Sequence, residues 1–326
     1  TVSGYTRQDL HIWENMVATA LRSSGVTPDD ILQIRLDPGL ATWGRDYQGG
    51  AEALGASVIP NTVLSIEKQR MVMRDYKSSV LVTTPSYAHQ LAAYLVSKGL
   101  NRGDLSLKTL ILVGEPASAA QRDDLEEKLH VRTWQHFGLS EVPGPALAYE
   151  CENRSCLHVN DDHFLPEIID PATGESLPAG AIGELVLTTL TTRAFPLIRF
   201  RTGDMARILP EACDCDCRLV RIEWRPERSD RLIRVRGVKI HEAQILAGIE
   251  AALGMPPQHA CMFEKRYREE TFLEIWIAVD DALFSDEIKR LENRIKAVRD
   301  QVQEATGVPV IVRLKEQASI IACKLA

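Results

Sequence analysis

The chain has 326 residues, a length at which two domains are expected. Hydrophobic residues make up 45% of it and charged residues 25%, and these globular values exclude disorder or a coiled coil as the main interpretation. The net charge of −7 and the lack of a Lys/Arg run argue against a nucleic-acid binder, and no apolar run is long enough to span a membrane.

The first half of the chain alternates between strand-like and helix-like patterns. Thr6 followed by Asp9 forms a capping-box-like start, which predicts a helix through about Arg22. The short apolar runs that follow are ILQIRL (31–36), ASVIP (56–60), SVLVTT (79–84), TLILVG (109–114) and VRTW (131–134). Between them lie helical patterns such as AEALG, SIEKQRMVMRDY, YAHQLAAYLVSKG and SAAQRDDLEEKLH. This alternation predicts an α/β fold with a parallel sheet.

After about Glu150 the pattern becomes β-rich. The strand-like segments are HFLPEIID, GELVLTT, PLIRFRT, MARIL and RLVRIEW. The last hundred residues then predict a small βαββαβ-like domain, with one helix from about His241 to Leu253. We place the boundary within 224–230, which gives an N-terminal domain of residues 1–227 and a C-terminal domain of residues 228–326.

The seven cysteines are clustered rather than evenly spaced. Cys151 and Cys156 form one group, and Cys213, Cys215 and Cys217 form a second. The first ten residues do not form a signal peptide, so the reducing cytoplasm is the expected compartment. Clustered cysteines without secretory context favour a metal site over disulfides, although reduced surface thiols remain an alternative.

A lone carboxylate stands out in HFGLSE (136–141). Glu141 follows a strand-like run, where Gly138 could simply form a turn and leave Glu141 solvated. Ligands of open α/β sheets, however, bind at the carboxyl ends of strands, and both VGEP (113–116) and HFGLSE fall at such ends.

Several further motifs occur in one order and spacing. They are GYTRQDLHIW, ALGASVIP, TTPSY, VGEP, FGLSEVPGP, DDHFLPEIIDPATGE, GELVLTTLTTRAFPLIRFRTGD and ERSDRLIRVRGVKI. Together, from the first residues to about Leu246, they resemble the adenylate-forming ligases and, within these, the phenylacetate–CoA ligase family. The resemblance implies activation of a small aryl carboxylate by ATP and transfer to coenzyme A, with a large N-terminal and a small mobile C-terminal domain.

The resemblance assigns nucleotide contacts to residues of this chain. Glu141 would hold Mg²⁺ at the ATP phosphates, since a hard cation prefers carboxylate oxygen. Ser140 would hydrogen-bond the α-phosphate, and Phe137, followed by Gly138, would stack on adenine. The other adenine wall would consist of Gly114, Glu115 and Pro116.

Downstream motifs imply further roles. Asp204 would accept hydrogen bonds from the ribose hydroxyls, and Arg228 would reach the nucleotide. Asp230 would be the hinge of the small domain. Gly237 would let backbone approach the pantetheine tunnel, although a simple turn glycine is an alternative.

The cysteine clusters also fit the resemblance, which implies a structural zinc. Its ligands would be Cys151, His158, Cys213 and Cys215, a set suited to tetrahedral Zn²⁺. Cys156 and Cys217 are spare thiols that could replace one of them.

The acyl pocket is less well defined by the motifs. Tyr87 lies where the family walls its carboxylate pocket, and Trp43 and Arg45 belong to a segment that shapes it. Tyr87 could equally be plain core. GLATWG here replaces the family's GLFTGG, so the identity of the acid stays open.

Two departures concern the ends. The family's Gly/Ser/Thr-rich triphosphate loop precedes the segment that opens this chain, so the sequence looks truncated. Near the other end, Lys324 in ACKLA is the candidate for the family's catalytic lysine, with an ordinary terminal lysine as the alternative.

We therefore expect an aryl- or arylacetate–CoA ligase that uses ATP, Mg²⁺ and coenzyme A, carries a structural zinc and contacts neither nucleic acid nor membrane; a homodimer stays open. Two rivals remain. One is a non-catalytic nucleotide- or acyl-binding remnant, or a subunit that needs a partner. The other is an adenylating enzyme whose acceptor is an amine or a carrier protein.

Overall fold

The computed structural model describes residues 3–36, 41–99, 104–142, 144–215, 217–230, 232–236, 238–257, 259–267, 270–278, 288–317 and 319–320. The chain divides into two compact units, Thr1–Ser229 and Asp230–Ala326. The division falls directly after the last strand of the first unit, β11 (Arg221–Arg228).

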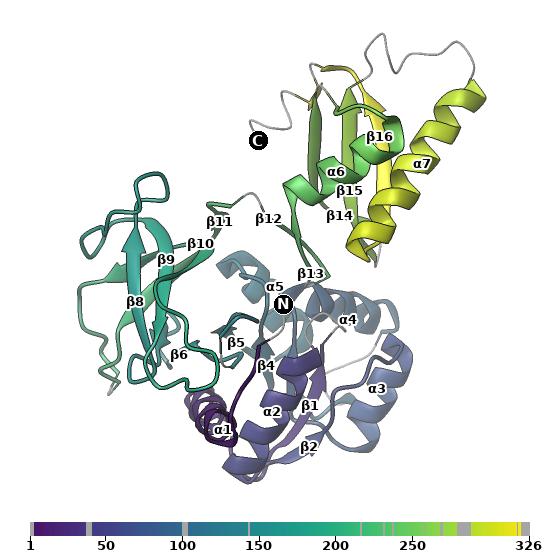
Figure 1. The fold of residues 1–326 in the computed structure, drawn as a ribbon. Helices are drawn as coiled ribbons and strands as arrows, with labels where there is room; N and C mark the ends of the chain where they lie inside the picture. Colours follow the sequence, from purple (N-terminus) through teal and green to yellow (C-terminus); the bar gives the residue numbers. More distant parts are fainter. Residues whose placement is uncertain are drawn as a thin grey trace. The chain divides into compact units, whose positions relative to one another are not determined.

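The first unit is built on one sheet of eleven strands, in the order β2-β1-β3-β4-β5-β6-β7-β11-β10-β9-β8 (Figure 1). The strands from β2 to β5 run parallel to their neighbours. They are β2 (Ser57–Ile59), β1 (Ile31–Arg35), β3 (Val80–Thr83), β4 (Thr109–Leu112) and β5 (Arg132–Phe137). The predicted parallel sheet is confirmed, because strands linked through a helix return in the same direction.

Helices cover both faces of the parallel strands. They are α1 (Arg7–Ser23), α2 (Ala41–Leu54), α3 (Ile66–Asp75), α4 (Pro85–Ser97) and α5 (Ala119–Leu129). α1 and α2 pack on the face that includes Val80 and Val82, whereas α3, α4 and α5 pack on the face that includes Leu81. Alternate side chains of β3 therefore enter two separate cores, as strand geometry requires.

Beyond β5 the sheet becomes antiparallel. Its strands are β6 (Ala148–Glu150), β7 (Leu157–Val159), β11, β10 (Phe200–Leu209), β9 (Gly183–Thr189) and β8 (Phe164–Ile169). A third core lies here, and it includes Trp13 and Met16 of α1. The pairing of β10 with β11 shifts register between Asp204 and Ala206, an irregularity of the kind found beside functional sites.

The second unit has its own core. Its elements are β12 (Leu232–Val235), β13 (Val238–His241), α6 (Glu242–Leu253), β14 (Ala260–Tyr267), β15 (Glu270–Ala278), α7 (Ile288–Thr306) and β16 (Val310–Lys315). β12 pairs with β13, and β14, β15 and β16 form a separate sheet. Ile249 of α6 and Val302 of α7 share a core with Ile275 of β15. The mixed α/β fold class predicted from the sequence is confirmed.

Local patterns explain where the predictions held and where they did not. The capping box is present, because the Thr6 hydroxyl accepts from the Asp9 amide and the Asp9 carboxylate accepts from the Thr6 amide. The segment GLATWGRDY, by contrast, was not predicted as a helix. Its residues 41–47 open α2, whose buried Trp43, Tyr47 and Ala51 recur at helical spacing. PLIRFRT and MARIL, expected as two runs, contribute to the single strand β10.

Among the described residues, the structure has no helix with the length and apolar character needed to cross a membrane.

Candidate functional site

The end of β5 carries the HFGLSE motif. Phe137 is the last strand residue, is 1% exposed and packs edge-on against Trp224 of β11, with ring centroids 4.8 Å apart. Gly138 follows, and a Cβ there would lie 2.5 Å from the carbonyl oxygen of Pro145. Only glycine fits this close approach of two backbones. The lack of room for a Cβ atom, rather than an unusual φ angle, therefore requires glycine at position 138.

Ser140 and Glu141 come directly after this tight passage. Ser140 is exposed and Glu141 is half-buried, and the Ser140 hydroxyl donates to the Glu141 carboxylate at 3.1 Å. Both side chains therefore follow the carboxyl end of a parallel strand, where open α/β sheets bind ligands.

The VGEP stretch lies at the end of the neighbouring strand β4. Gly114 has a φ of 81°, which favours glycine, and Glu115 follows it. The Glu115 carboxylate accepts from the backbone amide of Ser86 at 3.2 Å and from its hydroxyl at 2.5 Å. Ser86 belongs to the first turn of α4, where an anionic side chain is favoured by the helix dipole. The VGEP and TTPSY motifs are thus joined directly, and Pro116 continues the connection to α5.

Asp204 and Arg228 form a buried ion pair across β10 and β11. Arg228 Nη1 donates to Asp204 Oδ1 at 2.6 Å, and the two side chains are 8% and 1% exposed. Arg228 Nη2 also donates to the carbonyl of Thr202 at 2.9 Å. Since Phe137 packs on Trp224 of the same strand β11, this pair belongs to the sheet region that receives the HFGLSE motif.

The residues expected at the acyl pocket lie in the core. Trp43 is 6% exposed in the core of α1, α2 and the sheet, and Tyr87 is 5% exposed in the core of α3, α4 and α5. The Arg35 guanidinium lies 4.3 Å from the Tyr87 ring centroid. The two aromatic side chains are therefore on opposite faces of the parallel strands, which does not support a single pocket lined by both.

Four of the clustered cysteine and histidine residues converge. One ligand atom from each of Cys151, His158, Cys213 and Cys215 lies within 4.8 Å of all the others. The Cys151 and Cys213 sulfurs are 3.7 Å apart, and Cys215 Sγ lies 3.5 Å from His158 Nε2. A tetrahedral zinc, with bonds of about 2.3 Å to sulfur and about 2.0 Å to nitrogen, holds its ligand atoms roughly 3.5–3.8 Å apart. The four side chains therefore fit such an ion.

The two spare thiols lie outside this group. Cys156 Sγ accepts from Arg221 Nη1 at 3.7 Å, and Cys217 offers its carbonyl, rather than its sulfur, to Cys215. Burial opposes ionisation of Cys213, but hydrogen bonds from Cys215 and Asn153 lower its pKa to about 6, which favours the thiolate that a metal binds. The geometry favours the four-residue set over its variants.

A buried pair missed by the sequence analysis ties the cysteine cluster to β5. The Arg122 guanidinium donates to both carboxylate oxygens of Glu150, at 2.6 and 2.8 Å. The same carboxylate accepts from the Gln135 amide at 2.9 Å, and the next residue is Cys151. No local sequence pattern predicts this contact, because α5, β5 and β6 come together only in the folded protein.

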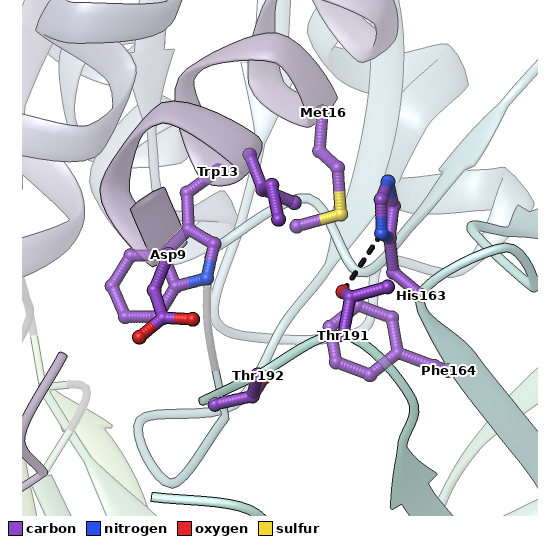
Figure 2. A pocket seen from close by; sticks show the side chains of 8 residues that line it. Asp9, Trp13, Met16, His163, Phe164, Thr191 and Thr192 are labelled. Atoms are coloured by element: carbon purple, nitrogen blue, oxygen red, sulfur yellow. Dashed lines mark hydrogen bonds between the residues drawn. The ribbon is translucent and has the colours of Figure 1, made fainter. Parts of the chain in front are cut away.

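A small pocket lies where α1 meets the β9–β10 connection. Figure 2 shows Asp9, Trp13 and Met16 of α1 facing His163, Phe164 and Thr191. The buried Asp9 carboxylate accepts from the backbone amides of Arg193 at 2.9 Å and Ala194 at 3.3 Å, besides its bonds in the capping box. The Asp9 carboxylate beside this pocket therefore fixes the segment that leads into β10, the strand that carries Asp204.

In the second unit, Asp230 is exposed and its carboxylate accepts from the Leu232 amide at 3.3 Å. Gly237 and Lys324 lie outside the described residues.

Comparison with known sequences gives one consistent answer. Residues 49–191 match the family model of the AMP-binding enzymes. The chain is 36% identical over 323 residues to the phenylacetate–coenzyme A ligase of Thermus thermophilus, which covers 97% of this chain and 73% of the relative. It is 39% identical over 246 residues to the phenylacetate–coenzyme A ligase of Pseudomonas putida, which covers 75% of this chain and 55% of that relative.

Solved structures show the same fold. A 2-hydroxyisobutyryl-CoA ligase in complex with 2-HIB-AMP and CoA matches with a TM-score of 0.81 at 22% identity, over 97% of this chain and 68% of its own. The amide bond synthetase McbA from Marinactinospora thermotolerans matches with a TM-score of 0.63 at 16% identity, over 94% of this chain and 61% of its own. At these identities the similarity concerns the fold alone.

Proposed function

The chain belongs to the phenylacetate–CoA ligase family of AMP-forming acid–thiol ligases, and from this we propose that it activates an aryl or arylacetic acid with ATP and transfers the acyl group to coenzyme A. The observation that carries the proposal is the convergence of the motif residues within the first unit. Glu115, Phe137 and Glu141 follow or end neighbouring parallel strands, and Phe137 contacts the strand that holds Arg228 against Asp204.

The proposed reaction has two steps. A carboxylate oxygen of the acid attacks the α-phosphorus of ATP, and pyrophosphate leaves with the electrons of the broken P–O bond. The thiolate sulfur of coenzyme A then attacks the acyl carbonyl, and AMP leaves. Mg²⁺ would offset negative charge at the phosphates. Glu141 would hold that cation, and its half-buried position after the end of β5 suits the role.

The adenosine half of the nucleotide would be held by buried, pre-positioned groups. The Asp204 carboxylate would accept from the ribose hydroxyls while Arg228 keeps it oriented. Adenine would bind between the Phe137 ring and Gly114, Glu115 and Pro116, and the ring, 1% exposed beside Trp224, would have to turn outward to meet it. Ser140 would donate to the α-phosphate in place of its present bond to Glu141.

Further parts of the proposal rest on residues away from this cluster. Asp230 would serve as the hinge of the second unit, Gly237 would line the pantetheine path, and Lys324 would stabilise the charge that develops during adenylation. Cys151, His158, Cys213 and Cys215 would hold a structural zinc, since all four positions of a tetrahedral ion would be filled by protein.

The experiment is ATP–pyrophosphate exchange by the full-length protein with a panel of acids, namely phenylacetate, benzoate and a short aliphatic acid. The proposal expects exchange with an aryl acid and thioester formation when coenzyme A is added. Exchange with the aliphatic acid alone would contradict the substrate class. Exchange without thioester formation, but with capture of the acyl group by hydroxylamine, would point to a different acceptor.

A further inference from the structure

Three polar side chains form a buried chain of hydrogen bonds beneath the adenine-binding stretch. His136, on β5, is 0% exposed. Its Nδ1 lies 2.8 Å from the hydroxyl of Tyr47 on α2, and its Nε2 lies 2.9 Å from the hydroxyl of Ser24 at the end of α1. These hydrogen bonds thus join α1 and α2, which cover one face of the sheet, to the end of strand β5.

The direction of each hydrogen bond follows from the partners. Ser24 donates its single hydroxyl proton to the carbonyl of Ala20 at 3.0 Å, so it must accept from His136 Nε2–H. Nδ1 is then the acceptor, and it receives the proton of the Tyr47 hydroxyl. The Ser24 end therefore fixes the neutral tautomer with the proton on Nε2, and the Tyr47 hydroxyl can satisfy the remaining nitrogen.

The charge state and the ring contact of the imidazole agree with this assignment. Burial lowers the pKa of His136 to about 3, so the ring stays neutral at physiological pH. The Tyr47 ring stacks on it with centroids 5.9 Å apart and an angle of 20°. A neutral imidazole has one donor and one acceptor, and both are used here.

The position of His136 in the sheet shows which part of β5 these side-chain hydrogen bonds hold in place. The pairing of β5 with β4 ends at Leu112 and Gln135, one residue before His136. Beyond this point His136 and Phe137 are paired on the β6 side, with Tyr149 and Ala148. The side-chain bonds of His136 therefore add to the β6 ladder in holding β5 where its pairing with β4 has stopped, immediately before Phe137 and Gly138.

We propose that His136 is a positioning residue, which uses its bonds to Tyr47 and Ser24 to set the stretch Phe137–Glu141 for nucleotide binding. The role rests on the proposed function of that stretch. An apolar residue could fill the same space, but the buried Tyr47 hydroxyl would then lack its acceptor. Neither partner touches the nucleotide in this assignment, so the effect would pass through the strand.

The test is Tyr47→Phe in the full-length protein, with Tyr149→Phe as the matched control. Tyr149 contacts the edge of the same imidazole, at 6.4 Å between centroids, and makes no described hydrogen bond to it. We expect Tyr47→Phe to weaken AMP binding in calorimetry roughly tenfold, and to raise the KM for ATP similarly, since small misplacements are costly at such sites. The KM for the acid and both properties of Tyr149→Phe should stay within about twofold of the parent.

A double variant, Tyr47→Phe with His136→Leu, separates positioning from packing. Replacing both partners by apolar groups of similar shape restores much of the stability lost by one replacement. Recovered stability with AMP binding still weakened supports positioning. Recovery of both, or unchanged AMP binding in Tyr47→Phe, overturns it. An inactive parent would contradict the proposed function instead, and AMP calorimetry would still decide the role of His136 because it needs no turnover.

Discussion

The Arg228 guanidinium donates to the Asp204 carboxylate at 2.6 Å across two antiparallel strands, with both side chains almost fully buried. A buried carboxylate held in this way is oriented before any ligand arrives. In the proposed function, this pair would therefore link stability and nucleotide binding in the same two residues.

Asp204→Asn should weaken both properties. Removing one partner of a buried ion pair leaves the other charge uncompensated, which costs about 3–5 kcal/mol of unfolding free energy. Loss of hydrogen bonds to a charged group should weaken AMP binding by roughly 1.5–3 kcal/mol. Urea unfolding and calorimetry measure the two effects separately. A variant with parental AMP affinity would remove Asp204 from the nucleotide site.

Gly138→Ala should destabilise the protein. The added Cβ would meet the Pro145 carbonyl oxygen at 2.5 Å, and such overpacking typically costs about 1–3 kcal/mol. Gly4→Ala is the control, because a Cβ there meets nothing within 4 Å. Urea midpoints of the two variants measure the difference, and equal midpoints would show that the 138–145 backbones separate easily.

Zinc should be retained through purification at about one equivalent per chain. Cys213→Ser should lower the bound zinc strongly, whereas Cys156→Ser should leave it unchanged, since Cys156 is a neighbouring thiol outside the four-residue set. Metal analysis of protein prepared without added zinc makes the comparison. Parental zinc in Cys213→Ser, or loss in Cys156→Ser, would show that the ligand set is wrong.

Asp46 should make stability depend on pH. Burial raises its pKa from 3.8 to about 6, partly opposed by Arg45. The folded state therefore binds more protons than the unfolded chain between these values, so this stabilising contribution is complete below pH 3.8 and is lost as the pH rises through 6.

Asp46→Asn should accordingly exceed the parent in stability at pH 7 by up to roughly 3 kcal/mol, with the difference shrinking toward pH 4. Urea unfolding at several pH values measures this difference. The half-exposed Asp75 supplies the control variant Asp75→Asn. A difference that does not change with pH would contradict the burial argument.

The features predicted most reliably from the sequence are contacts between residues close in the chain and motifs shared with a known family. The Thr6–Asp9 capping box is local, and the cysteine and histidine set followed from the resemblance to the ligase family. The Arg122–Glu150 pair and the second role of Asp9 could not be predicted, because their partners lie 28 and more than 180 residues away. His136 was also missed: a single histidine inside a motif gives no signal until α1 and α2 bring Ser24 and Tyr47 to its two nitrogens.

The central claim is that this member of the ligase family adenylates its acid at the end of β5. The most direct test is to measure acid-dependent ATP–pyrophosphate exchange by the full-length protein and by its Glu141→Gln variant. Glutamine keeps the size of the half-buried side chain but removes the charge that would hold Mg²⁺. We predict exchange by the parent with an aryl acid, and loss of at least about a hundredfold in the variant at unchanged urea midpoint. Parental exchange in Glu141→Gln, or no exchange by the parent with any acid, would contradict it.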